Sequence, residues 1–267
     1  MEQELWVTKL VNLVLGKPAA ALLVALGFHP NPEAPIPNHI AMEIFIFLLA
    51  AIFFLWLRSR LSVDRPGVMQ QFMETLFTNP FRLGVRDMAG DFIGHDGERY
   101  IPMLGSIGLF ILFSNLISLI PTLESPTAQY SVPFGCALLV FLYYNWCGLR
   151  RGPLRYGKHF AGPIPALAPV MVPVEIFSHL SRLISLTARL WANMLASETI
   201  YGLILALTVT LSIFLEKLNP VGYVSVVLPL LAPILFIALH LLVAFIQAFV
   251  FTILPIIYVA GAVAEQH

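Results

Sequence analysis

Two mostly apolar stretches close the chain, at residues 174–215 and 223–264, and each has the pattern of one very long helix. Only the short segment EKLNPVG separates them. At about 1.5 Å per residue each helix would be roughly 60 Å long, about twice the thickness of the hydrocarbon layer of a bilayer. Two such helices cannot both stand upright in a membrane. Either they are broken, the second at Pro229, Pro233 or Pro255, or they lie steeply tilted as an intramembrane hairpin.

The composition places the whole chain in the bilayer. Hydrophobic residues make up 58% of the sequence and charged residues 11%, compared with about 25% charged residues in soluble domains. The 15 basic and 15 acidic residues balance, which gives no reason to expect nucleic-acid binding. Cys136 and Cys147 lie in one apolar segment without further ligands, so we predict two small buried side chains, no metal site and no cofactor.

Three shorter apolar segments before the long stretches have the length of membrane spans. Ahead of them, residues 1–39 contain an apolar run that is broken at Lys17 and Pro18, which predicts an interfacial helix followed by a proline-rich linker. Apolar residues at spacings of three and four then predict an amphipathic surface helix. The predicted segments are the spans 40–57, 101–120 and 131–149, the surface helix 66–90 and the long tilted helices 174–215 and 223–264. They predict an all-α integral membrane protein with a single membrane domain, residues 1–267.

The basic residues between these spans predict the topology. The loop after the first span holds six Lys or Arg residues, the next loop none, and the loop after the third span four. Because basic residues concentrate on the cytoplasmic side, we expect the N-terminus outside and the C-terminus in the cytoplasm.

Arginine inside an apolar helix needs a physical reason, and Arg189 is the central case. At about 100° per residue it shares one helix face with other polar residues to within about 40°. These are Glu175, Ser178, Arg182, Ser185 and Asn193. A guanidinium at the bilayer centre costs at least about 2.5–3.5 kcal/mol. We therefore expect either a wet cavity or a buried carboxylate partner for Arg189.

A second polar face is predicted on the last helix, where His240, Gln247 and Tyr258 fall within about 20° of one line. For Gln247 and Tyr258, structural hydrogen bonding is as reasonable as a functional role. Glu198, nine residues after Arg189, is about 180° round the helix and roughly 13.5 Å further along it.

Two separate polar regions therefore flank Arg189. Glu198 and His240, with Gln247, lie toward the outside, and a second set lies toward the cytoplasm. If both regions hold water, they form two half-channels that each reach only the middle of the membrane. The cytoplasmic set consists of Glu175, Ser178, His179 and Ser185.

The segment SLTARLWANM from Ser185 to Met194, followed by Glu198, closely resembles the signature of the F-type ATP synthase subunit a family. RPGVMQQFMETL from Arg65, FSNLISLIP from Phe113 and HLLVAFIQAFVFTILPIIY from His240 extend the resemblance to most of the chain. The sequence departs from the family pattern at three positions, where Ala188 is smaller than usual, Ser118 replaces an aspartate of some relatives, and Pro255 replaces a threonine-like residue.

The resemblance implies a proton-translocating stator subunit of a bacterial ATP synthase, without catalytic activity of its own, in the cell inner membrane. Its implied partners are a rotating ring of c subunits, the subunit b stator stalk and the lipid bilayer. Arg189 would separate the half-channels by attracting a ring carboxylate, and Arg182 is its rival for that role. Glu198 and His240 would relay protons in the outer half-channel. The remaining implied site residues are the orienting Gln247 and Asn193 and the inner-channel Glu175 and Ser185.

Two other classes of function remain as alternatives. A self-contained transporter or channel could use Arg189 to bind an anionic substrate, but the paired broken helices of inverted repeats are not seen. A membrane enzyme is disfavoured because the sequence has no Walker motif, G-x-S-x-G or H-E-x-x-H. His240 beside Glu198 favours protons over sodium as the transported ion.

Overall fold

The computed structural model describes residues 5–28, 31, 34–78, 84–120, 123–153, 156, 168–218 and 223–263. Within them the chain is helical without strands, which confirms the all-α prediction. Six helices are long and apolar enough to cross a membrane. The elements are α1 (Trp6–Ala25), α2 (Asn38–Ser59), α3 (Val68–Phe77), α4 (Val85–Ile93), the 3-10 helix η1 (His95–Tyr100), α5 (Ile101–Ile117), the 3-10 helix η2 (Pro126–Ala128), α6 (Ser131–Arg151), α8 (Ala168–Leu218) and α9 (Tyr223–Val263).

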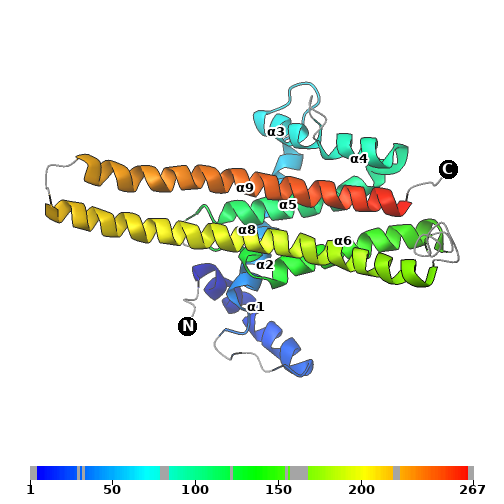
Figure 1. Ribbon diagram of the computed structural model, residues 1–267, viewed down its shortest axis with the longest axis horizontal. Helices are drawn as coiled ribbons and strands as arrows, with labels where there is room; N and C mark the ends of the chain where they lie inside the picture. Colours follow the sequence, from blue (N-terminus) through cyan, green and yellow to red (C-terminus); the bar gives the residue numbers. More distant parts are fainter. Residues whose placement is uncertain are drawn as a thin grey trace.

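Helices α8 and α9 form a hairpin that runs the length of the molecule (Figure 1). The sequence left open whether these helices are broken or continuous. Each is observed as a single continuous helix. Helix α9 continues through its three prolines and α8 through Pro173. Proline is tolerated in membrane helices because neighbouring helices and side chains satisfy the backbone groups that it frees.

Helices α5 and α6 lie along this hairpin, whereas α2 crosses it (Figure 1). Buried side chains of α5, α6, α8 and α9 form one core. Its members Leu190, Phe251, Ile111 and Tyr144, one from each helix, are at most 1% exposed. Since α2 and the hairpin cross, they cannot both be perpendicular to a bilayer. With 51 residues α8 is far too long to stand upright, so the geometry favours an upright α2 and a tilted hairpin.

The surface segment differs from the prediction of one helix over 66–90. It forms two helices, α3 and α4, with Gly84 immediately before the second. A Cβ atom on Gly84 would overlap the carbonyl group of Phe77, so the close approach of the two helices requires glycine there. Met73 of α3 and Met88 of α4 are buried, as expected of an amphipathic pair. Helix α4 packs on α9.

The C-terminal end of α6 lies beside η1, in the segment between α2 and α5. Arg151 at the end of α6 is 3.6 Å from the carboxylate of Asp96 in η1, and Asp96 is also 3.9 Å from Arg99. The membrane topology that the basic residues predict stays a prediction. Helix α1 lies on the opposite side of the hairpin from α3 and α4 (Figure 1).

The N-terminal helix α1 continues through Lys17 and Pro18, where the sequence predicts a break. The helix is therefore long enough to span a bilayer, and its interfacial placement stays a prediction. Its first half is tied to the start of α2. Thr8 Oγ1 donates a hydrogen bond of 2.8 Å to Asn38 Oδ1, and Asn12 exchanges two 3.0 Å bonds with the backbone of Ile36.

The contact between α5 and α9 generates a stability prediction at Gly108. A side chain there would overlap Thr252 Oγ1, which donates a hydrogen bond to the Ala248 carbonyl. We expect Gly108→Val to destabilise the protein by about 1–3 kcal/mol, measured as a lower thermal midpoint of the purified protein in detergent.

Gly135→Val in α6 is the matched control, because an added Cβ there meets nothing within 4 Å. Thr252→Ala should restore part of the loss in the Gly108→Val protein. Equal midpoints for the two valine variants would contradict the close α5–α9 packing.

Candidate functional site

Arg189 lies on a face of α8 that points away from the protein's own core. Its polar neighbours on that face, Ser185 and Asn193, are also exposed. The opposite face of the same turns is buried, with Leu190 and Met194 fully enclosed. Alanine surrounds the arginine on the exposed face, at positions 188, 192 and 196. Short side chains there leave room for another helix to approach Arg189 closely.

Among the described residues Arg189 has no hydrogen-bond or ion-pair partner. Its guanidinium is close enough to act electrostatically on Tyr258 of α9. Arg182, two turns earlier on α8, lies 5.3 Å above the ring of that tyrosine. An arginine remains protonated at any physiological pH, so the charge of Arg189 needs either water or a carboxylate that is not among the described residues.

His240 of α9 joins three helices through its two ring nitrogens. Nδ1 is 2.5 Å from Ser197 Oγ of α8, and Nε2 is 2.9 Å from Ser118 Oγ at the end of α5. Nε2 also lies 3.3 Å from the carbonyl oxygen of Asn115, which can only accept a hydrogen bond. His240 is buried, with 6% of its surface exposed. Its position and both nitrogens are therefore fixed by polar groups of other helices.

Glu198 lines the same small cavity as His240. The carboxylate accepts a hydrogen bond of 3.1 Å from the backbone N–H of Ser125, in the segment before η2. The cavity has a volume of about 30 Å³ and is also lined by Ser118 and Tyr201. A single water needs roughly 10–15 Å³, so the space is sufficient for one. The structure thus brings Glu198 and His240 together without a direct hydrogen bond between them.

Gln247 lies deeper in the protein. The side chain is 4% exposed and its Oε1 has no hydrogen-bond partner among the described residues. Ser114 Oγ and Asn115 Nδ2 of α5 are likewise buried without one. Unpaired polar atoms are costly in a membrane interior, and either an ordered water or a functional role would explain each of these.

A third cluster lies toward the N-terminal end of α8. His179 Nε2 is 3.2 Å from Glu175 Oε1, and His179 Nδ1 is 2.9 Å from the hydroxyl of Tyr144 in α6. The rings of Tyr144 and Tyr258 are 5.7 Å apart between centroids. Ser185, which the sequence assigns to this region with Glu175, lies on the exposed face beside Arg189, as its helical spacing predicts, and its role in the inner channel stays a prediction.

The sequence analysis missed several members of these clusters. Ser118 stood out only as a departure from the family pattern, although it contacts His240. Ser197 precedes Glu198, and this adjacency to a charged membrane residue was the available signal. Tyr144 lies within an apolar run and gave no signal. His179 was placed in the cytoplasmic group without a role.

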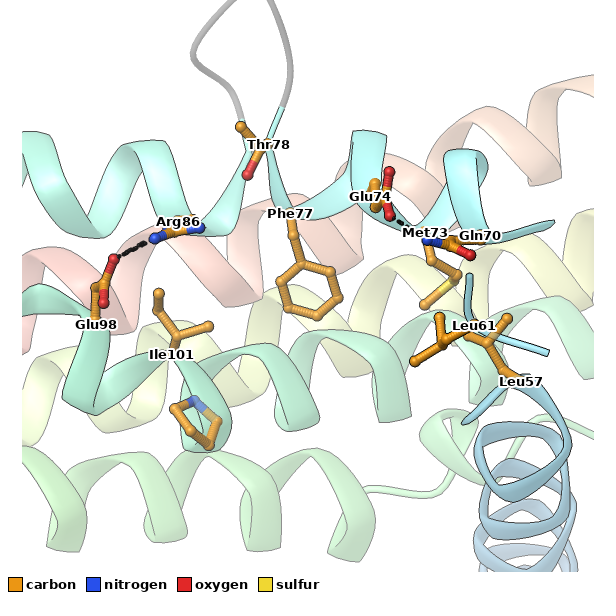
Figure 2. Close-up of a pocket in the computed structure, with 11 residues that line it drawn as sticks. Leu57, Leu61, Gln70, Met73, Glu74, Phe77, Thr78, Arg86, Glu98 and Ile101 are labelled. Carbon is orange, nitrogen blue, oxygen red and sulfur yellow. Dashed lines mark hydrogen bonds and ion pairs between the residues drawn. The ribbon is translucent and has the colours of Figure 1, made fainter. Parts of the chain in front are cut away.

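A larger cavity lies on the side of α3 and α4 (Figure 2). It has a volume of about 760 Å³ between the end of α2, α3, α4 and the start of α5. The charged groups on its wall are paired, because Arg86 is 2.6 Å from Glu98 and Gln70 donates a 2.7 Å bond to Glu74. With its polar groups satisfied, this cavity offers no free ionisable group for ion transfer.

Comparison with known proteins identifies the family. The family described as ATP synthase A chain matches residues 40–260. ATP synthase subunit a of Koribacter versatilis is 40% identical over 269 residues, which cover 100% of both chains. The subunit a of Solibacter usitatus is 41% identical over 92% of this chain and 95% of its own. That of Aquifex aeolicus is 38% identical over 86% of this chain and 99% of its own.

The His240 contacts predict a measurable coupling with Ser197. His240→Leu leaves the buried Ser197 hydroxyl without its partner, at a cost of about 1–3 kcal/mol. We expect Ser197→Ala to cost less in the His240→Leu protein than in the wild type, because the hydrogen bond is already lost. Thermal midpoints of the four proteins in detergent measure this double-mutant cycle. Additive effects would contradict the contact.

Proposed function

Since the chain belongs to the family of ATP synthase subunit a, we propose that it is the proton-translocating stator subunit of an F-type ATP synthase. As a family member it is a multi-pass membrane protein of the ATP synthase complex. In the proposed function it passes protons to and from the carboxylates of a rotating c-subunit ring. The ring and the subunit b stalk are its proposed partners, and it does not itself make ATP.

The proposal rests on Arg189, which is exposed, has no partner among the described residues and has alanines as its neighbours on the helix face. A ring carboxylate that passes this face would be attracted as the anion and would lose its proton there. Arginine cannot take up that proton and pass it on, because its guanidinium is always protonated. Protons then cross only when the ring turns.

Two access routes are supported by the clusters on either side of Arg189. The cavity of Glu198 and His240 suits the outer half-channel, since a carboxylate and an imidazole can each take up and release protons. The cluster of Glu175 and His179 suits the inner one. Along α8 these carboxylates lie roughly 13.5 Å and 21 Å from Arg189 in opposite directions. Each route would therefore end near the arginine without joining the other.

The proposed orientation follows from the exposed basic residues on one side of the hairpin. They lie at the end of α2, in α4 and η1, and at the end of α6. Positive charge favours the cytoplasm, so the N-terminus would be outside and the membrane the inner membrane of a bacterium. These residues are Arg58, Arg60, Arg86, Arg99, Arg150 and Arg151.

A self-contained carrier of an anion is the alternative function. Such a carrier would enclose its binding arginine in a central cavity between helices. The exposure of Arg189 on the outer face of α8 supports contact with a partner subunit instead.

The central prediction concerns Arg189→Ala in inverted membrane vesicles. We expect ATP-driven acidification to disappear, and passive proton leak to persist or grow after the soluble ATPase head is stripped. Arg60→Ala is the matched control, because that exposed arginine follows α2 and lies against Trp56 rather than on the face of α8 that carries Arg189. If the Arg189→Ala complex still pumps, the proposed separator is wrong.

Glu198→Gln tests the outer route separately. The amide oxygen of glutamine can still accept the hydrogen bond from Ser125, so assembly should be preserved. We expect pumping to slow by roughly tenfold or more, because a proton-transferring group is lost while Arg189 remains. Pumping rate and passive leak are measured on the same vesicles, and a fast leak in this variant would refute the assignment of Glu198.

A further inference from the structure

His179 stands out among the buried polar residues because both of its ring nitrogens contact groups that can exchange protons. It is 7% exposed and lies between α8 and α6. Its Nδ1 is 2.9 Å from the Tyr144 hydroxyl, and its Nε2 is 3.2 Å from the Glu175 carboxylate. Both partners can themselves take up or release a proton, which distinguishes this histidine from one whose nitrogens bond only to backbone groups.

The three groups form a line from the buried interior toward the surface. Tyr144 is 1% exposed, whereas the side chain of Glu175 is 26% exposed. The carboxylate can therefore exchange protons with solvent, and the hydroxyl can exchange them only with its protein neighbours. His179 lies between the two and separates them.

Tyr258 of α9 connects this line to the central arginine. Its ring packs on Tyr144, with 5.7 Å between centroids, and it experiences the charges of both Arg182 and Arg189. The cluster thus extends from the neighbourhood of Arg189 on one side to the partly exposed Glu175 on the other, with members from α6, α8 and α9.

We propose that His179 is the proton relay of the inner half-channel, between Tyr144 and Glu175. This inference rests on the proposed function, and it assigns one specific residue to the inner route. The Tyr144 hydroxyl gives its proton to Nδ1 and takes up another from the channel side. The proton on Nε2 passes to the Glu175 carboxylate, which releases it to the cytoplasm. A half-turn of the imidazole ring about its Cβ–Cγ bond then brings the protonated nitrogen to the Glu175 side again, and no net charge is left on the chain.

The electrostatic surroundings of the imidazole come from all three packed helices. Glu175 contacts it from α8 and Tyr144 from α6, and Tyr144 packs in turn on Tyr258 of α9, whose ring lies 5.3 Å from the Arg182 guanidinium. Glu175 would stabilise a transient imidazolium and Arg182 would oppose its accumulation. A relay group needs this balance, because a permanently charged histidine would hold its proton.

The experiment measures proton conduction through the membrane sector of assembled complexes in inverted vesicles stripped of the ATPase head. Conduction is recorded as a function of the pH on the exposed inner side. The test variant is His179→Gln, since glutamine can keep hydrogen bonds on both sides but cannot carry a proton. Thr187→Val is the matched control, because this buried residue of α8 bonds only to its own helix, at the Leu183 carbonyl.

We expect His179→Gln to slow conduction at least about tenfold and to lose the pH-dependent step of the wild type. Pumping in the unstripped vesicles should be slow but fully coupled. The Thr187→Val complex should behave as the wild type. If His179→Gln conducts at the wild-type rate with the same pH profile, the relay is wrong.

Tyr144→Phe decides the matter should the His179→Gln complex fail to assemble. The phenyl ring preserves the core and removes only the hydroxyl that would feed Nδ1, so conduction should again fall several-fold. Conduction equal to that of the wild type would overturn the relay. Failure of the proposed function itself has a different signature, since it appears as intact pumping in the Arg189→Ala complex.

Discussion

A mostly apolar helix of 51 residues cannot stand upright in a bilayer, and the rest of the architecture depends on that constraint. Its backbone is satisfied internally, so it has no reason to break, and tilting is the remaining solution. Helix α9, with 41 residues, is also too long to stand upright, and α5 and α6 pack along the same direction. These helices cover one side of the hairpin and leave the other side of α8 open. The arginine lies on that open side.

Charge is distributed along α8 in a way that fits the proposed mechanism. A permanently protonated residue occupies the middle of the helix, and groups that can gain or lose a proton lie toward both ends. These groups are positioned by other parts of the chain, Glu198 by the backbone N–H of Ser125 before η2 and His179 by Tyr144 of α6. The local direction of proton transfer would therefore be set by side-chain contacts between helices, and only the central charge would be shared by both routes.

The sequence predicted the features that arise within one helix. The stripe of Arg189, Ser185 and Asn193 follows from helical spacing alone, and all three are exposed together. Contacts between distant segments could not be predicted in this way. Ser118 meets His240 across 122 positions of sequence, and no periodicity encodes such a pairing. The direction of α5 and α6 also escaped prediction, since their length fits an upright span equally well. The division of the surface helix depends on backbone crowding at Gly84.

The alanines around Arg189 have a mechanical consequence for a partner that moves. Methyl groups form no directional bonds, so successive copies of a rotating subunit would meet a nearly uniform apolar surface without strong local interactions. The only strong, specific attraction on this stretch is the guanidinium itself. The turning partner would then slide along this face with little resistance. It would be held once per subunit, at the arginine, where the proton is transferred.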